Sequence, residues 1–165
     1  MLKYKALPID FKNEDSIWEA FVGFWNLYLS NVPDDGEGLN TLTKLQKNLI
    51  IFNYYRGSVI RGGHQVFLDL YMDSIGVKAV IDSSLALGFG DEIIVPLECI
   101  SDKLSFLDTL DDEDEEKIKW ELEEQEKFFE PINRAFYKYY DDGIIDDKMI
   151  QYLRENATEF FEDIA

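Results

Sequence analysis

The sequence predicts a mainly helical protein with one domain, and three observations support this. The chain has 165 residues, which is the size of one domain with its own hydrophobic core. Apolar residues recur three and four positions apart along most of the chain, as on the buried face of a helix. Clusters of glycine, proline and aspartate separate these stretches and favour turns. We therefore expect a single compact all-α domain over residues 1–165, with at most one minor β-hairpin.

The first helix is expected to begin near Ser16, because Ser16 and Glu19 have the spacing of a capping box. Residues 33–38 are rich in proline, aspartate and glycine, and they should end this helix as a loop. The expected buried face has helical spacing and consists of Ile17, Phe21, Phe24 and Tyr28.

Three further helices are expected before residue 91. The second begins near Thr41 or Thr43 and ends around Gly62 and Gly63, since two adjacent glycines favour a tight turn. A third, short helix covers 64–71, and a fourth covers 75–87. A β-hairpin remains an alternative for the apolar runs 77–81 and 93–95, because they have strand-like composition and short runs of this kind are ambiguous.

The rest of the chain is expected to be helical as well. A fifth helix begins at Asp91, with Pro96 in or near its first turns. The sixth follows the acidic run 111–116, because a helix N-terminus favours negative charge, and Pro131 should kink or restart it. Its buried stripe is predicted to be Ile118, Leu122, Gln125 and Phe129, continued by Ile132, Phe136 and Tyr140. A last helix from about residue 146 is anchored by Met149, Leu153, Phe160 and Phe161.

The charge of the chain is strongly negative and uneven. Acids number 34 and bases 16, which gives a formal net charge of −18. Residues 1–107 carry a net −5 and residues 108–165 a net −13. Nucleic acid and anionic membranes both require cationic patches, so this charge argues against direct binding to either. The favoured partners are cationic: a basic protein face, a polyamine or a metal ion.

The cysteine content and the N-terminus predict a cytoplasmic protein. Cys99 is the only cysteine, so no internal disulfide forms, as is typical of a reducing compartment. The N-terminus lacks the apolar stretch of a signal peptide, and no apolar run approaches the ~20 residues that span a bilayer. Cys99 itself is expected to be a small buried hydrophobic residue.

No pattern in the sequence indicates catalysis or a cofactor. His64 is the only histidine, and we expect it to be a cap or a structural hydrogen-bonding residue. The 88–91 segment lacks the lysine of a phosphate-binding loop, and neither acidic cluster has the layout of a calcium-binding EF-hand loop. An enzyme would require a cleft at Gly62, Gly63 and His64 that holds a group with a shifted pKa.

The candidate functional feature is therefore the acidic surface. Carboxylates three or four positions apart on a helix lie about 5–6 Å from each other, so Glu116, Glu123, Glu126 and Glu130 are expected to form one exposed row. DNA is a rod of regularly spaced negative charges, and a rigid body with such rows fits the basic groove of a DNA-binding protein. The predicted binding residues are Asp111, Asp112, Glu113, Asp114, Glu115, Glu116, Glu123, Glu124, Glu126 and Glu130.

Residues 54–71 resemble the core of a bacterial family typified by a small acidic DNA-mimic protein. In that family a helix ends in an Asn-Gly-Gly turn, which Gly62 and Gly63 match, and a Gln and aromatic residues follow, which Gln65 and Phe67 approximate. The segment 85–90 is similar to a later family segment. The chain departs from the pattern at Ser58, where the family has an acid nearby, at Arg61 in place of Asn and at His64 in place of Phe.

The resemblance covers about residues 40–105, and the acidic helices of 111–163 follow it. It implies a helical, non-enzymatic dimer whose partner is a transcriptional repressor or a histone-like protein. The predicted function is thus a DNA mimic that sequesters a basic DNA-binding protein. The alternative is an immunity protein that neutralises a cationic toxin such as a nuclease.

Overall fold

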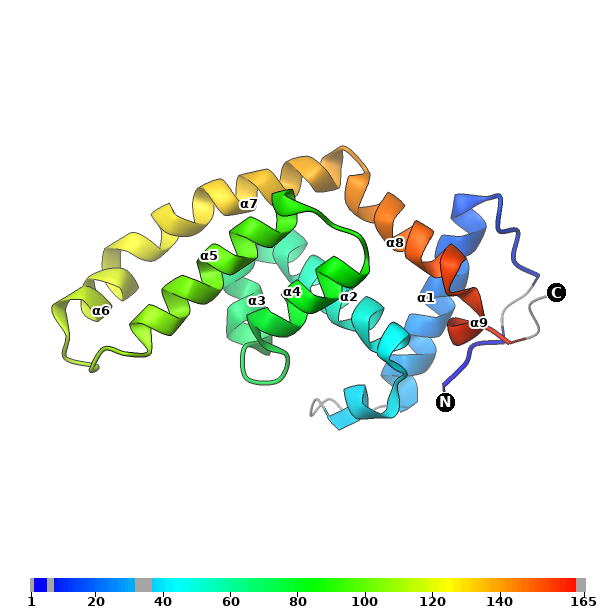
Figure 1. The fold of residues 1–165 in the computed structure, drawn as a ribbon, viewed down its shortest axis with the longest axis horizontal. Coiled ribbons are helices and arrows are strands. Elements are labelled where there is room, and N and C mark those ends of the chain that lie inside the picture. The colour runs from blue at the N-terminus through cyan, green and yellow to red at the C-terminus, as the bar shows by residue number, and fades with distance from the viewer. Residues whose placement is uncertain (1, 6–7, 32–36, 163–165) are drawn as a thin grey trace.

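A computed structural model describes residues 2–5, 8–31 and 37–162 of the chain, and these form an all-α domain (Figure 1). The helices are α1 (Glu14–Asn31), the 3-10 helix η1 (Glu37–Thr41), α2 (Lys44–Gly62), α3 (His64–Tyr71), α4 (Gly76–Ala86), α5 (Asp91–Leu107), α6 (Glu115–Lys119), the π-helical turn η2 (Trp120–Glu124), α7 (Gln125–Asp141), α8 (Ile144–Glu155) and α9 (Ala157–Phe160).

The helices are arranged around α2. This helix packs against α3 and α4, while α8 packs against α1 and α7. Figure 1 shows that α7 and α8 follow one another along a long edge of the molecule, with α1 and α9 at the end where both termini lie. At the opposite end α5 and α7 project together, and α6 lies at their tip.

The predicted start of the first helix was wrong by two residues. The side-chain oxygen of Asn13 accepts hydrogen bonds from the backbone N–H groups of Asp15 (3.0 Å) and Ser16 (3.4 Å), so Asn13 caps α1. The Ser16 hydroxyl instead accepts from the N–H of Asp10. The predicted face is confirmed, since Ile17, Phe21, Phe24 and Tyr28 are all buried. Residues 33–36 of the predicted loop lie outside the described residues.

The second helix begins and ends as predicted. The Thr43 side chain accepts from the N–H of Gln46, and the Gln46 side chain accepts from the N–H of Thr43, which completes a capping box. Gly63 ends the helix with φ of +85°, a conformation that favours glycine. A Cβ atom on Gly63 would lie 2.5 Å from the Asn133 side chain, so glycine also permits the close approach of α7.

Residues 77–81 and 93–95, for which a hairpin was left open as an alternative, are helical, and the expected burial of Cys99 was wrong. Residues 77–81 belong to α4 and 93–95 to α5, where their apolar side chains serve helical faces. The buried face of α5 includes Ile93, Ile94, Leu97 and Ile100, and Cys99 lies on the other face, exposed. Pro96 lies inside α5 as predicted, and the described residues contain one isolated bridge, between Tyr4 and Phe161, in place of strands.

One basic side chain connects four helices. The Arg56 guanidinium of α2 binds the Asp146 carboxylate of α8 at 2.6 Å. It also lies 5.2 Å from the centroid of the Trp18 ring in α1 and 5.3 Å from that of the Tyr140 ring in α7. Cation–π contacts and an ion pair are both stronger when the guanidinium is shielded from water. The contacts of Arg56 therefore stabilise the packing of the four helices against each other.

Candidate functional site: an acidic arm

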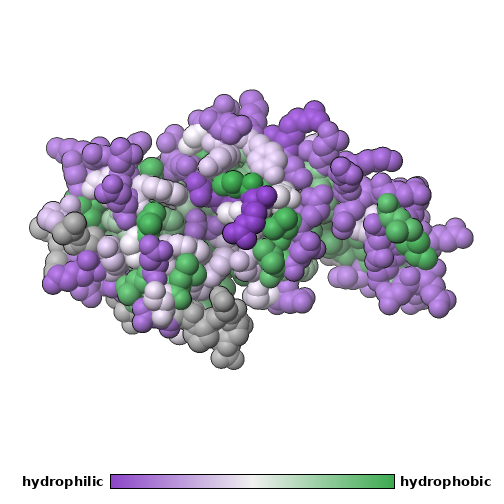
Figure 2. Space-filling model, turned by 180° about the vertical axis from the view of Figure 1, so that it is seen from behind, coloured by the Kyte–Doolittle hydropathy of each residue, from purple (hydrophilic) through white to green (hydrophobic). Residues whose placement is uncertain are grey.

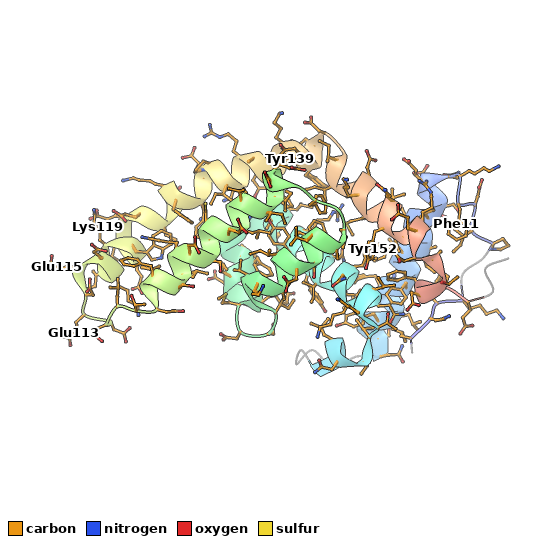
Figure 3. All side chains as sticks on the ribbon, in the orientation of Figure 1. Phe11, Glu113, Glu115, Lys119, Tyr139 and Tyr152 are labelled. Carbon is orange, nitrogen blue, oxygen red and sulfur yellow. The ribbon has the colours of Figure 1, made fainter. Side chains whose placement is uncertain are left out.

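The strongest concentration of charge lies at the projecting end of the molecule. We call residues 108–130 the acidic arm: the loop after α5, then α6, η2 and the first turns of α7. The acidic arm contains twelve acids and three bases, a net charge of −9, which is half of the −18 carried by the whole chain. Figure 3 shows Glu113, Glu115 and Lys119 at the far tip, with α5 and α7 leading back to the domain.

Most of the ten predicted site residues are exposed. Only Asp114 and Glu124 are partly buried, and the eight exposed ones are Asp111, Asp112, Glu113, Glu115, Glu116, Glu123, Glu126 and Glu130. Asp114 has a structural role, since its carboxylate accepts from the N–H of Glu116 at 2.9 Å and caps α6. The structure thus brings the predicted residues together on one projecting element.

Three of the ten carboxylates form ion pairs. Asp112 pairs with Lys117 at 2.7 Å, Glu124 pairs with Lys119 at 2.8 Å, and Glu130 pairs with Arg134. The hydrogen bond and charge of Lys117 lower the pKa of Asp112. Apart from the cap Asp114, six carboxylates form no ion pair and no side-chain hydrogen bond with the described residues: Asp111, Glu113, Glu115, Glu116, Glu123 and Glu126.

The first part of the predicted buried stripe was wrong, although Phe129 and Phe136 are buried as predicted, and the predicted place of the helix irregularity was wrong as well. Pro131 lies inside the continuous helix α7, and the interruption falls at η2, where the hydrogen-bonded turn holds one more residue than in an α-helix. Ile118 is 43% exposed and Leu122 77% exposed, although both were expected to be buried. Trp120, at 4% exposure, takes their place.

The extra residue in η2 explains this exchange. An α-helix turns about 100° per residue, so an uninterrupted helix would place Ile118 within about 20° of Phe129. One additional residue in the turn shifts the phase by about 100° and aligns Trp120 with Phe128 instead. The two rings meet edge to face with centroids 5.1 Å apart. The same shift separates Glu116 from Glu123, so the four-glutamate row is broken at η2 and continues only from Glu123.

Trp120 attaches the acidic arm to α5. Its ring lies 6.0 Å from that of Phe129, centroid to centroid, and the Lys103 ammonium group of α5 lies 4.8 Å from the Trp120 centroid. An ammonium over an aromatic face is an attractive cation–π contact. The sequence contained a signal for this arrangement, because Trp120 and Phe128 do not fit the predicted stripe.

An open groove of about 740 Å³ follows α7 from the acidic arm toward α8. Glu126 and Glu130 belong to both the acidic arm and the groove. The remaining lining residues are Gly62, Gln65, Asn133, Arg134, Tyr137, Lys138, Asp141 and Asp142. The groove was not predicted, because its walls come from the α2–α3 turn and α7, which are far apart in the sequence.

His64 lies behind this groove and has a structural role, as expected. Its Nδ1 lies 2.6 Å from the Asn133 side-chain oxygen and its Nε2 lies 2.8 Å from the Tyr55 hydroxyl. The amide oxygen only accepts, so Nδ1 carries the proton and Nε2 accepts from Tyr55. Burial lowers the pKa of His64 to about 4, while the bond to Asn133 opposes this shift. With both nitrogens occupied and the side chain buried, His64 does not reach the groove.

The part of the chain that the structure describes contains neither a cluster of metal ligands nor a helix suited to a membrane. No three histidine, cysteine, aspartate or glutamate side chains there are grouped so as to hold a metal ion. None of its helices combines the length and the apolar character needed to cross a membrane.

The fold and the site together define an all-α protein with a projecting acidic arm. No protein-family model matches it, and no curated protein or solved structure is significantly similar to it. The resemblance to acidic DNA mimics therefore stays a prediction.

Proposed function

We propose that the protein is a DNA mimic that binds a basic DNA-binding protein through the acidic arm. The observation that carries this proposal is the set of six carboxylates that form no ion pair with the described residues, displayed on the acidic arm that Trp120 attaches to α5. A basic protein that accepts these carboxylates loses access to the phosphates of DNA. Each ionic contact releases counterions, so the binding should weaken steeply with salt.

Solubility alone is a weak explanation for this surface. A net charge of about 2–8 in magnitude is sufficient for a small domain, whereas the acidic arm alone carries −9. Like charges one turn apart also destabilise a helix by about 0.2–0.5 kcal/mol per pair. A surface that opposes folding and exceeds the need of solubility is explained if a cationic partner neutralises it.

Two variants of equal net charge test the proposal. The arm variant replaces Glu113, Glu115, Glu123 and Glu126 with Gln. The control variant neutralises four exposed carboxylates outside the acidic arm, by D69N, D73N, E98Q and D102N. Each protein is immobilised and offered a bacterial lysate freed of nucleic acid, and retained proteins are identified and eluted with rising salt.

We expect the original protein and the control to retain one or more basic DNA-binding proteins, and the arm variant to release them at much lower salt. Added duplex DNA should compete for the retained protein. Equal losses in both variants would show that bulk charge alone acts, and retention of no basic protein would sink the proposal. A retained nuclease whose activity the protein inhibits would indicate the immunity function instead.

A further inference from the structure

The acidic arm also displays an exposed apolar pair. Ile118 and Leu122 lie one turn apart, and Leu122 is the most exposed large hydrophobic residue of the part of the chain that the structure describes. Figure 2 shows hydrophobic side chains surrounded by hydrophilic ones at the arm end of the molecule. Aliphatic side chains at this exposure, in the most highly charged segment of the chain, call for a physical reason.

The backbone itself places the pair outside. A π-helical turn is rare and less favourable than continuous α-helix, and such turns occur often at functional sites. In this chain η2 lets Trp120 occupy the interior and leaves Leu122 in water. Burial of Trp120 favours this arrangement, whereas the π-helical turn and the exposure of Leu122 each cost free energy, and a partner that covers the pair would remove the cost of exposing Leu122.

We propose that Ile118 and Leu122 are the central apolar contact for a basic amphipathic helix of the partner protein. This inference rests on the proposed function, and it names the chemistry of the partner: an apolar stripe flanked by lysine and arginine. Interfaces commonly have an apolar centre and a charged rim, and an amphipathic helix presents both. Glu115, Glu121 and Glu126 lie three or four positions from the pair and supply the anionic rim.

Charge selects this occupant over the others. A second copy of the arm would bring a net −9 against a net −9, so self-association through the pair is opposed. An anionic lipid surface is repelled for the same reason. A basic helix satisfies both parts of the surface: its cations meet the carboxylates, and its apolar stripe removes Leu122 from water.

The two parts of the surface have separable signatures. Carboxylate contacts govern the slope of affinity against salt and the association rate. Apolar burial at the centre is nearly independent of salt and acts on the dissociation rate. Changing the pair should therefore lower affinity by the same factor at every salt concentration, whereas neutralising the rim should flatten the slope.

Two defined peptides test the inference. One is a synthetic basic helix of about four turns with Leu on one face and Lys and Arg on the other. The second has every Leu replaced by Ala, which keeps charge and helix propensity. Their affinities are measured by fluorescence anisotropy at several salt concentrations. The proteins are the original chain, an I118S/L122S variant, an L70S/L85S control whose leucines are exposed outside the arm, and the arm variant with four Gln.

The original protein should bind the Leu peptide about tenfold more tightly than the Ala peptide, which corresponds to about 1.4 kcal/mol. I118S/L122S should remove this preference without changing the salt slope, and L70S/L85S should keep it. Circular dichroism and thermal unfolding verify that each variant is folded. Equal affinity for both peptides, or an equal loss in the L70S/L85S control, would overturn the inference.

The outcomes separate this inference from the proposed function. If the arm variant weakens binding and flattens the salt slope while I118S/L122S changes nothing, the acidic surface binds by charge alone and only the apolar contact is refuted. If neither peptide binds the original protein even at low salt, the charge-based proposal and the apolar contact both fall.

Discussion

The core around α1 and the acidic arm are built from the same kind of pattern, and they turn out differently. In both, apolar residues recur three and four positions apart. In α1 every residue of the predicted stripe is buried, whereas in the acidic arm Ile118 and Leu122 are exposed. The difference shows that spacing predicts burial only while the helix keeps one phase, and the π-helical turn η2 changes that phase.

The largest expected effect compares one residue from each region. Phe24 is fully buried and its ring meets that of Phe160 edge to face, with centroids 5.2 Å apart. We expect Phe24→Ala to lower the free energy of unfolding by about 3–5 kcal/mol, because it leaves a cavity. Leu122→Ala should change it by about 0.5 kcal/mol or less, since the side chain is already in water.

Urea unfolding of both variants, followed by circular dichroism, measures this contrast. A loss of more than about 2 kcal/mol for Leu122→Ala would mean that Leu122 is buried in solution, because only a core truncation has that size. The contrast between a buried stripe in α1 and an exposed apolar pair in the acidic arm would then be refuted.

Local signals were sufficient for most of the fold. The predicted start of α2 near Thr41 or Thr43 and its predicted end at the adjacent glycines were both correct, because helix caps and turns act through neighbours in the sequence. The capping-box spacing indicated Ser16 as the first cap, whereas the structure uses Asn13, a residue type that is equally suitable. Spacing alone did not resolve such choices, and it did not reveal which face of α5 would leave Cys99 exposed.

The candidate site was predictable in content but not in shape. Most carboxylates of residues 111–130 are exposed, because burying so many like charges would cost too much free energy. The acidic composition of the segment is sufficient to predict this exposure. The glutamate row is broken by η2, and η2 depends on tertiary contacts that spacing does not reveal. Trp120 packs against Phe128 and Phe129 of α7 and against Lys103 of α5. The groove along α7 was not predictable either, since Gly62 and Asn133 line the same groove only in the folded chain.

The second effect depends on pH and concerns the interior. His64 has a pKa of about 4 in the folded protein against about 6.5 in an unfolded chain. The unfolded state therefore binds more protons between these values, so the stability contribution is complete above pH 6.5 and is lost as the pH falls toward 4. We expect a loss on the order of 2 kcal/mol by pH 5.

Carboxylates also titrate at low pH, so the measurement compares the original protein with His64→Gln. Their difference in urea stability between pH 7.5 and 5 isolates the histidine, because the acids are common to both. His64 is the only histidine, and its ring proton signal in NMR spectra should not move until the pH is well below 6. A titration midpoint near 6.5 would show that the His64 ring is in contact with water, which would contradict its burial in the core.

The smallest effect returns to the acidic arm and reverses the usual sign of a mutation. Glu126 has Glu123 three positions before it and Glu130 four positions after it, and it has no ion pair among the described residues. Neutralising Glu126 to Gln should stabilise the protein by a few tenths of a kcal/mol at low salt, since like-charged pairs at this spacing cost about 0.2–0.5 kcal/mol each. Asp82 is the matched control, because it pairs with Lys78 at 3.3 Å on another exposed helix face and Asp82→Asn should destabilise by a similar amount. Both differences should shrink above about 0.5 M salt, where screening is strong.

Stabilisation by Glu126→Gln at low salt would mean that the acidic arm opposes folding, and that its charge is retained for a reason other than stability. If Glu126→Gln instead destabilises, the carboxylate has a favourable partner in solution, and the case for a surface that awaits a cationic protein loses its physical basis.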